Sequence, residues 1–218
     1  MVLPKSVILI VCLIVGIVLV GVAMNKKKDL SAEGMVIILN GPSSVGKSSI
    51  VKAFQAQQPT PWLGAGIDHL YVGVIPLHWL DDQPEHRAIM TTEERFDGQA
   101  MSVKAIFGPA GEKVIKGMHS AIAAYAHAGN NVVVDYIKYE PHWFADLQEA
   151  LRGLKVIWVG VTASLETIER REKARGTSPQ GHARNHYDTV HQGIKYDLVL
   201  NTDELTPAQC ADKLALLI

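Results

Sequence analysis

The sequence contains a segment whose residue types and spacing are those of a phosphate-binding loop. Residues 41–48 match the pattern G-x-x-x-x-G-K-[ST] at every fixed position. The two glycines allow successive backbone N–H groups to turn inward around an anion, and Lys47 adds a positive charge for the β- and γ-phosphates of a nucleotide. The Ser48 hydroxyl can hold Mg²⁺, and the following helix presents its positive end to the anion. The predicted nucleotide-binding residues are Gly41, Pro42, Ser43, Ser44, Val45, Gly46, Lys47, Ser48 and Ser49.

The context of this loop separates it from an ordinary glycine turn before a helix. An apolar run typical of a strand, Met35 to Leu39, precedes it. The residues after Ser49 have a helical pattern that places Ile50, Val51 and Phe54 on one face. The sequence lacks the N-K-x-D motif that reads guanine, which disfavours a GTPase. We therefore expect ATP and Mg²⁺ as the ligands.

Two aspartates follow predicted strands and are the acidic candidates for this chemistry. Asp68 comes directly after the predicted strand from Trp62 to Ile67, where a carboxylate can accept the proton of an attacking hydroxyl or orient it. Asp135 follows the apolar triplet from Val132 to Val134, a position that often supports the Mg²⁺ shell in phosphate-loop enzymes. The alternatives are a turn aspartate at the strand end for Asp68 and a helix-capping residue for Asp135.

Four arginines flank residues 176–181, a glycine-containing segment that we expect to be a mobile loop. Arginines on such a loop can close over a triphosphate and stabilise the charge of the transferring group. The alternative, solvated arginines paired with neighbouring glutamates on a helix, is favoured for Arg170 and stays open for Arg171 and Arg175. The fourth arginine is Arg184. The histidines have no metal-ligand spacing and are expected to be surface or packing residues, whereas Trp79 is a candidate for lining an acceptor pocket.

Predicted strands alternate with predicted helices, which indicates an α/β fold with a parallel sheet flanked by helices and with ligands at the carboxyl ends of the strands. Residues 81–98 lack a clear period and are expected to form a loop, and residues 101–107 are consistent with a strand or a loop. The remaining strands are predicted at 131–137, 154–161 and 197–200, and the helices at 112–128, 141–151, 164–175, 182–192 and 206–217.

The N-terminal residues are predicted to form a membrane anchor. Val7 to Met24 is an uninterrupted apolar run that would span roughly 27 Å as a helix, about the thickness of the hydrocarbon core. Lys26, Lys27 and Lys28 follow it, so we expect a single-pass anchor in the inner (cytoplasmic) membrane with the catalytic domain in the cytoplasm. A cleaved signal peptide and a dispensable extension are the alternatives, and the protein would be cytoplasmic without this segment. The expected division is an anchor and linker, residues 1–34, and a phosphotransferase domain, residues 35–218.

Composition narrows the function classes further. The formal net charge of the 218 residues is −1, which gives no support for a nucleic-acid partner. The two cysteines, Cys12 and Cys210, form no metal or redox motif, which fits a reducing compartment. The chain is too short for most motor ATPases, whereas kinases of small molecules and nucleotides fit its size. The composition leaves the oligomeric state open.

From Met35 onward the chain resembles the chloramphenicol phosphotransferase family, on the stretches IILNGPSSVGKSSIV, PWLGAGIDHL, NVVVDY, VIWVGV, RREKARG and VHQGIKYDLVLNT. The resemblance implies an adenylate-kinase-like fold that transfers the γ-phosphate of ATP to a hydroxyl, with Asp68 as the catalytic aspartate. It also implies that Arg171 and Arg175 are lid arginines. The family's usual G-D-R after the lid helix is Gly176-Thr177-Ser178 here, so one lid arginine is missing and Arg184 is a candidate to replace it.

The sequence therefore predicts an ATP-dependent phosphotransferase that acts on the hydroxyl of a small molecule, with Lys47, Asp68, Arg171 and Arg175 as catalytic residues and with Ser48 and Asp135 at the metal. Residues 77–107, where an acceptor would be recognised, resemble the family poorly. The altered lid motivates an alternative, a membrane-tethered nucleotide-binding or regulatory protein with little transfer activity. A toxin-type kinase that acts on a nucleotide sugar is a third hypothesis.

Overall fold

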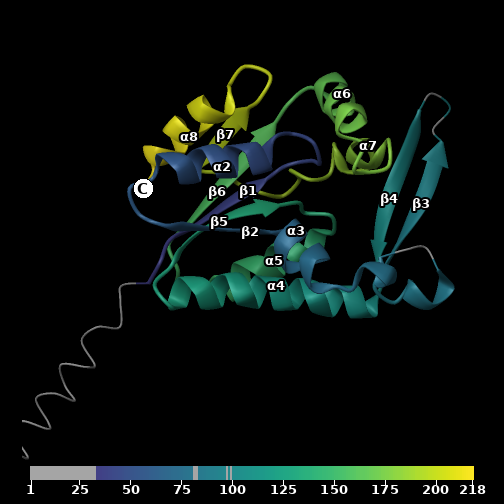
Figure 1. Cartoon of the computed structure of the whole chain (residues 1–218), viewed down its shortest axis with the longest axis horizontal. Coiled ribbons are helices and arrows are strands. Elements are labelled where there is room, and N and C mark those ends of the chain that lie inside the picture. The colour runs from purple at the N-terminus through teal and green to yellow at the C-terminus, as the bar shows by residue number, and fades with distance from the viewer. Residues whose placement is uncertain (1–32, 81–82, 97, 99) are drawn as a thin grey trace, which may run out of the picture. The chain divides into compact units, whose positions relative to one another are not determined.

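The structure, a computed structural model, describes residues 33–80, 83–96, 98 and 100–218 (Figure 1). Within these residues a five-stranded sheet forms the centre of the fold, with the strand order β2-β5-β1-β6-β7 and parallel pairing between all neighbours. The expected parallel α/β sheet is thus confirmed. The strands are β1 (Val36–Asn40), β2 (Trp62–Gly66), β5 (Asn131–Tyr136), β6 (Val156–Thr162) and β7 (Leu198–Asn201).

Helices cover both faces of this sheet, as Figure 1 shows. The helices α2 (Lys47–Gln57) and α8 (Pro207–Ala215) pack on one face, and α4 (Pro109–His127) and α5 (Pro141–Ala150) pack on the other. Three further helices stand at the carboxyl end of the strands, where the loop and the predicted acidic residues also lie. These are α3 (Ile67–Leu70), α6 (Leu165–Arg175) and α7 (His182–His186).

The central strand β1 is buried on both sides, which explains its uninterrupted apolar sequence. Ile37 and Leu39 face the core beneath α2 and α8, whereas Val36 and Ile38 face the core above α4 and α5. All four side chains are completely buried. The two hydrophobic cores pack against opposite faces of β1, so the phosphate loop that follows Asn40 begins from a firmly packed strand.

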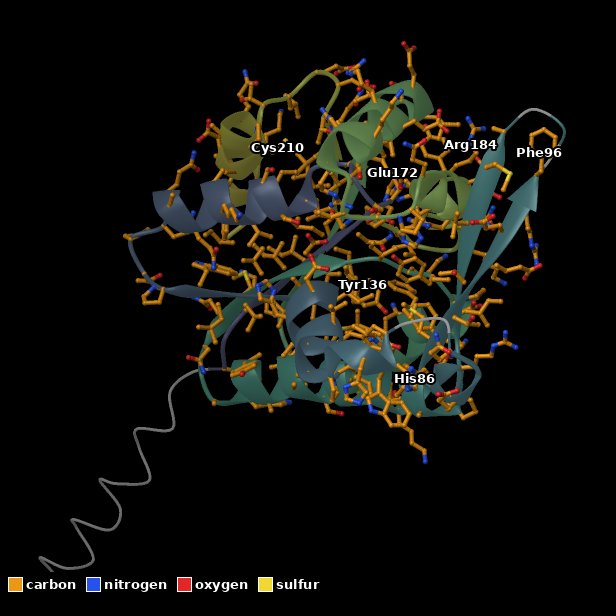
Figure 2. All side chains as sticks on the ribbon, turned by 45° about the vertical axis from the view of Figure 1, so that its right-hand side comes forward. His86, Phe96, Tyr136, Glu172, Arg184 and Cys210 are labelled. Atoms are coloured by element: carbon orange, nitrogen blue, oxygen red, sulfur yellow. The ribbon has the colours of Figure 1, made fainter. Side chains whose placement is uncertain are left out.

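A β-hairpin stands beside the main sheet and replaces part of the expected loop. The strands β3 (Met90–Phe96) and β4 (Met101–Phe107) pair antiparallel, so the expectation that residues 81–98 form a loop is wrong for Met90–Phe96. The 3-10 turn at Pro84–His86 and the turn residues that follow it agree with the expected loop. Strand β3 has a polar sequence, and its order comes from pairing with β4, as in the cross-strand pair of Glu93 with Lys104. Phe96, at the far end of the hairpin, is 65% exposed (Figure 2).

Helix boundaries follow the expected signals with a few corrections. Ser164 caps α6, since its hydroxyl accepts the Thr167 N–H. Helix α4 starts at Pro109, earlier than expected, because proline fits the first helical turn. Tyr125 has the spacing of the buried apolar positions of α4 but is 44% exposed. The expected helix at 182–192 ends at His186, after which the chain continues in turns.

The predicted membrane span, Val7 to Met24, lies outside the described residues. Among the residues that the structure does describe, none of the helices combines the length and the apolar character needed to cross a bilayer. The anchor and the division of the chain at residues 34 and 35 stay predictions.

Candidate active site

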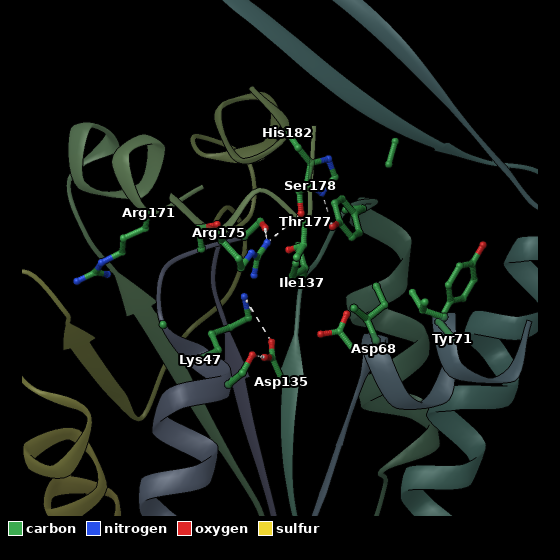
Figure 3. Close-up of a pocket in the computed structure, with 18 of the residues that line it drawn as sticks. Lys47, Asp68, Tyr71, Asp135, Ile137, Arg171, Arg175, Thr177, Ser178 and His182 are labelled. Atoms are coloured by element: carbon green, nitrogen blue, oxygen red, sulfur yellow. Dashed lines mark hydrogen bonds and ion pairs between the residues drawn. The ribbon is translucent and has the colours of Figure 1, made fainter. Parts of the chain in front are cut away.

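A cavity of about 930 Å³ opens at the carboxyl ends of the strands and brings the predicted site residues together (Figure 3). Its lining includes all six side chains predicted to act in catalysis or at the metal: Lys47, Ser48, Asp68, Asp135, Arg171 and Arg175. Part of the phosphate loop also lines it, namely Ser43, Ser44, Gly46, Ser48 and Ser49. The topology therefore gathers residues that are far apart in sequence around one space.

The phosphate loop has the tight backbone that its glycines predict. Gly46 has φ 105°, a conformation that L side chains rarely adopt, and it leads directly into the first turn of α2. Ser44 also has a positive φ, 62°, and its hydroxyl is buried without a hydrogen-bond partner in the described part of the protein. A strained backbone and an unsatisfied polar atom in this loop are features of a site built to hold a ligand.

Lys47 is buried and held from three sides. Its Nζ donates to the carbonyl oxygens of Gly41 at 2.9 Å and Pro42 at 2.8 Å, and lies 3.4 Å from Asp135 Oδ1. Burial lowers the pKa of the Lys47 ammonium, and the charge of Asp135 partly opposes that effect. The ammonium group therefore sits in a low-dielectric site beside the cavity, where a phosphate would provide a strong counter-charge.

Ser48 and Asp135 place two oxygen atoms that could bind a metal ion at the edge of the loop. The Ser48 hydroxyl donates to Asp135 Oδ2 at 2.5 Å. Asp135 sits near the carboxyl end of β5, in register with Leu39 of β1, and this pairing brings the carboxylate to the loop. Hydroxyl and carboxylate oxygens are the donors that Mg²⁺ prefers, so the two residues fit the predicted metal role.

Asp68 reaches the cavity from the opposite side. It lies in the first turn of α3, after a sharp bend at Gly66, where a Cβ atom would lie 2.4 Å from the carbonyl oxygen of Asp135. Only glycine allows β2 and β5 to approach this closely before the chain turns. The Asp68 carboxylate points across the cavity toward Lys47 and Asp135 (Figure 3). Its negative charge raises the pKa of Lys47, a smaller effect than that of Asp135.

The two predicted lid arginines occupy different places. Arg175 donates to the hydroxyls of Ser43 at 3.1 Å and Ser178 at 2.9 Å, next to Lys47. Arg171 points away from Lys47 in Figure 3 and binds the outer side of the loop, where it donates to the carbonyl oxygens of Val45 and Thr202. Arg175 is thus placed to reach a transferring phosphoryl group, whereas Arg171 braces the loop against the end of β7.

The other two arginines do not contribute to the cavity. Arg184 forms an ion pair with Glu169 at 2.6 Å and is absent from the described cavity lining, so in this structure it does not replace the missing lid arginine. Arg170 donates to the Thr167 hydroxyl, as expected for a helix-surface residue. Trp79 is also absent from the described lining.

Sequence reasoning missed an aromatic pair in the cavity wall. Tyr139, which follows β5, and His182, at the start of α7, form a hydrogen bond of 2.8 Å between the Tyr139 hydroxyl and His182 Nε2. Burial, followed by the nearby charges of Asp68 and Asp135, raises the pKa of Tyr139. Burial also lowers the pKa of His182. Their positions just after a strand and a lid loop were the available signal, but their pairing depends on the tertiary fold.

Glu172 fixes the start of α7 relative to α6. Its carboxylate is almost completely buried and accepts the backbone N–H groups of Gly181 at 2.8 Å and Ala183 at 2.9 Å. Figure 2 shows Glu172 between these elements, whereas Arg184 lies nearer the hairpin. Because α7 carries His182 into the cavity wall, this carboxylate determines the geometry of the wall.

We expect Glu172→Ala to lower the free energy of unfolding by about 2–4 kcal/mol, because two shielded backbone donors lose their charged acceptor. Chemical denaturation of the full chain measures this change. The matched control is Glu166→Ala on the exposed side of the same helix, for which we expect a loss below about 1 kcal/mol. Equal losses for the two variants would show that the Glu172 contacts contribute nothing specific.

The part of the cavity beyond Asp68 is mainly apolar. Helix α3 and its neighbours form one side, and the hairpin forms another. The residues of this acceptor half are Ile67, Tyr71, Val72, Leu80, Met90, Thr92, Ala105, Phe107, Ile137, Tyr139 and His182. None of these described lining residues is a lysine or an arginine. The cationic side chains of the cavity gather instead around the phosphate loop.

The fold and this site define the class of the protein: an α/β phosphate-loop protein with the architecture of small-molecule kinases. Residues 34–217 match the model of the family described as chloramphenicol phosphotransferase-like protein, and the chain belongs to this family. Two Mycobacterium tuberculosis proteins, from strains CDC 1551 and H37Rv and both named "Putative O-phosphotransferase", are each 32% identical over 171 residues. This match covers 78% of the chain and 76% of each relative.

Solved structures share the fold at low sequence identity. The Mycobacterium tuberculosis APS kinase CysC, in complex with AMPPNP and APS, matches with a TM-score of 0.58 and 18% identity, covering 85% of this chain and 97% of that chain. The tunicamycin resistance protein of Deinococcus radiodurans matches with a TM-score of 0.56 and 19% identity, covering 84% and 95%. These similarities support the kinase-type architecture of the sheet and its helices.

Proposed function

We propose that this protein is an ATP-dependent phosphotransferase that moves the γ-phosphate to a hydroxyl group of a small, uncharged molecule. The observation that carries the proposal is the placement of Lys47 and Asp68 on opposite sides of one cavity at the carboxyl ends of the strands. A cation for the phosphates and a carboxylate for the attacking hydroxyl are the two groups that this reaction needs. Family membership supports the same reaction class.

The phosphate side of the cavity fits a magnesium nucleotide. The loop backbone, Lys47 and Arg175 supply donors and positive charge for the phosphates, and Ser48 and Asp135 supply oxygens for the metal. Mg²⁺ bound with the nucleotide would neutralise part of the phosphate charge. The contacts of Lys47 with the carbonyl oxygens of Gly41 and Pro42 place its ammonium group at the entrance of the loop.

The proposed reaction is a direct transfer in line with the leaving group. The acceptor hydroxyl lies between Asp68 and the γ-phosphate, its oxygen forms a bond to phosphorus, and the bond from phosphorus to the bridging oxygen of ADP breaks. Asp68 takes the hydroxyl proton, while Lys47 and Arg175 stabilise the charge that spreads over the phosphoryl oxygens. Arg171 keeps the loop in place through its contacts with Val45 and Thr202.

The charge distribution of the cavity determines the class of acceptor. A phosphorylated or carboxylated acceptor needs a cation near its anionic group, because burying an unpaired charge is costly. The described residues of the acceptor half include no lysine, arginine, aspartate or glutamate, and the charged side chain at its boundary is the anionic Asp68. Apolar and aromatic side chains such as Tyr71 and Phe107 favour an uncharged molecule with apolar parts. Chloramphenicol, an uncharged alcohol, is therefore a rational first acceptor to test.

A transfer assay with γ-labelled ATP, Mg²⁺ and the purified full chain tests this function. We expect labelled product with at least one uncharged alcohol from a panel of chloramphenicol, nucleosides and related compounds. We expect less than about 1% of that rate with gluconate or a nucleoside monophosphate, which lack a cationic partner here. Lys47→Ala is the control for transfer by this site. Nucleotide binding without transfer to any acceptor would favour the regulatory alternative, and preferred transfer to anions would contradict the proposed acceptor class.

A further inference from the structure

His186 makes a contact with the phosphate loop that the proposed mechanism does not yet use. The backbone N–H of Ser43 donates to His186 Nε2 at 3.1 Å, in a buried position. His186 lies on α7, is only 3% exposed, and is 143 positions from Ser43 in the sequence. Ser43 is the third residue of the loop motif, so this hydrogen bond joins α7 directly to the phosphate loop.

The geometry of this contact fixes the protonation of the ring. A backbone N–H can donate only to a ring nitrogen without a proton, so the His186 ring is neutral and carries its proton on Nδ1. The ring also hydrogen-bonds the backbone of His182, one helical turn earlier. Burial, together with the positive charge of Lys47, lowers the pKa of His186 well below its usual value. The ring is thus a hydrogen-bond acceptor at neutral pH.

Packing holds the ring in this orientation. The Tyr139 ring meets His186 edge-on at 4.9 Å, and the His182 ring lies 5.1 Å away. Arg175, on the preceding helix, donates to the hydroxyl of the same Ser43 at 3.1 Å. His186 and Arg175 therefore both hold Ser43, the first through its backbone N–H and the second through its side-chain hydroxyl.

We propose that His186 is a positioning residue for the phosphate loop. By accepting a hydrogen bond from the Ser43 N–H, it fixes the backbone at Ser43 in the conformation that binds nucleotide phosphates. This role rests on the proposed nucleotide binding. Without this acceptor, the buried N–H group of Ser43 would lose its hydrogen-bond partner, and the backbone at Ser43 would rearrange to reach water. The other amides of the loop would then lose their alignment on the phosphates, and nucleotide affinity would fall.

Two substitutions at one position separate hydrogen bonding from packing. His186→Phe keeps an aromatic ring against Tyr139 but removes the acceptor, whereas the side-chain oxygen of His186→Gln can take the place of Nε2. We expect the dissociation constant of Mg²⁺·AMPPNP to rise at least about 10-fold in His186→Phe, and to stay within about 3-fold of wild type in His186→Gln. Calorimetric titration of the full-length proteins measures both, and a melting curve for each variant verifies folding.

The matched control is His127→Phe, at an exposed site in the last turn of α4, for which we expect unchanged AMPPNP affinity. Long-range ¹H–¹⁵N correlation spectra of histidine-labelled wild type provide a second readout, with the His186→Gln spectrum assigning the signal. We expect the neutral ring with its proton on Nδ1 at pH 7. A proton on Nε2, or a charged ring, would overturn the proposal even if His186→Phe fails to fold.

The remaining outcomes separate this role from the proposed function. His186→Gln binding as weakly as His186→Phe, or His186→Phe binding as tightly as wild type, would overturn the positioning role alone. Wild-type protein with the expected ring protonation but no affinity for AMPPNP would overturn the proposed function, and this role with it.

Discussion

Replacing Asp68 by asparagine is expected to lower the turnover of phosphoryl transfer by about 10²–10⁴-fold. The amide keeps the size of the side chain at the start of α3 but cannot take the proton of an attacking hydroxyl. Asp68 faces the space between the acceptor half and Lys47, so its loss acts on the chemical step. Steady-state kinetics with the best acceptor from the transfer assay measures the change.

Nucleotide binding should distinguish this effect from general damage to the site. We expect the dissociation constant of Mg²⁺·AMPPNP to change by less than about 3-fold in Asp68→Asn, since the phosphates are held by the loop on the other side. Asp212→Asn, the same chemical change on the exposed side of α8, should leave both quantities unchanged. Turnover near the wild-type value in Asp68→Asn would remove this residue from the role of base.

The second large effect is expected for Lys47→Ala. Removing the ammonium group takes away a buried positive charge beside the phosphate loop, and loss of one such donor typically costs about 10²–10³-fold in rate. Here nucleotide affinity should fall as well, because under the proposed function Lys47 would contact the phosphates in both the bound and the transition state. The variant should therefore lose both AMPPNP binding and transfer, unlike Asp68→Asn.

Lys52→Ala is the matched control, because Lys52 lies on the same helix α2 but is exposed to solvent. We expect wild-type kinetics and binding for this variant. A melting curve for Lys47→Ala shows whether the loss of the buried ammonium group leaves Asp135 unpaired and destabilises the protein. Full transfer activity in a folded Lys47→Ala protein would show that another group receives the phosphates, and that the loop has been assigned the wrong ligand.

The lid illustrates how far motif matching reaches. The resemblance to the family pairs Arg171 and Arg175, which are one helical turn apart, yet the structure gives them different surroundings. Arg175 meets Ser43 across 132 sequence positions, and Arg171 meets Val45 across 126. Their roles follow from which part of the loop each reaches, and this depends on how α6 docks on the loop. Kinetic roles for both arginines stay predictions.

The sequence by itself determined the alternation of strands and helices and the loop from Gly41 to Ser48. Apolar runs, helix caps and glycines act over a few neighbouring residues, so their effect can be read along the chain. It also pointed to Asp68 and Asp135, because residues that follow parallel strands meet at one edge of the sheet.

Only the tertiary structure decided the hairpin, the apolar acceptor half and the cluster of Tyr139, His182 and His186. The strand β3 has a polar sequence without an apolar period, and it is ordered by its partner β4. The two histidines gain their neutral, buried state from contacts with residues more than forty positions away. Such contacts depend on long-range packing, which local sequence patterns do not encode.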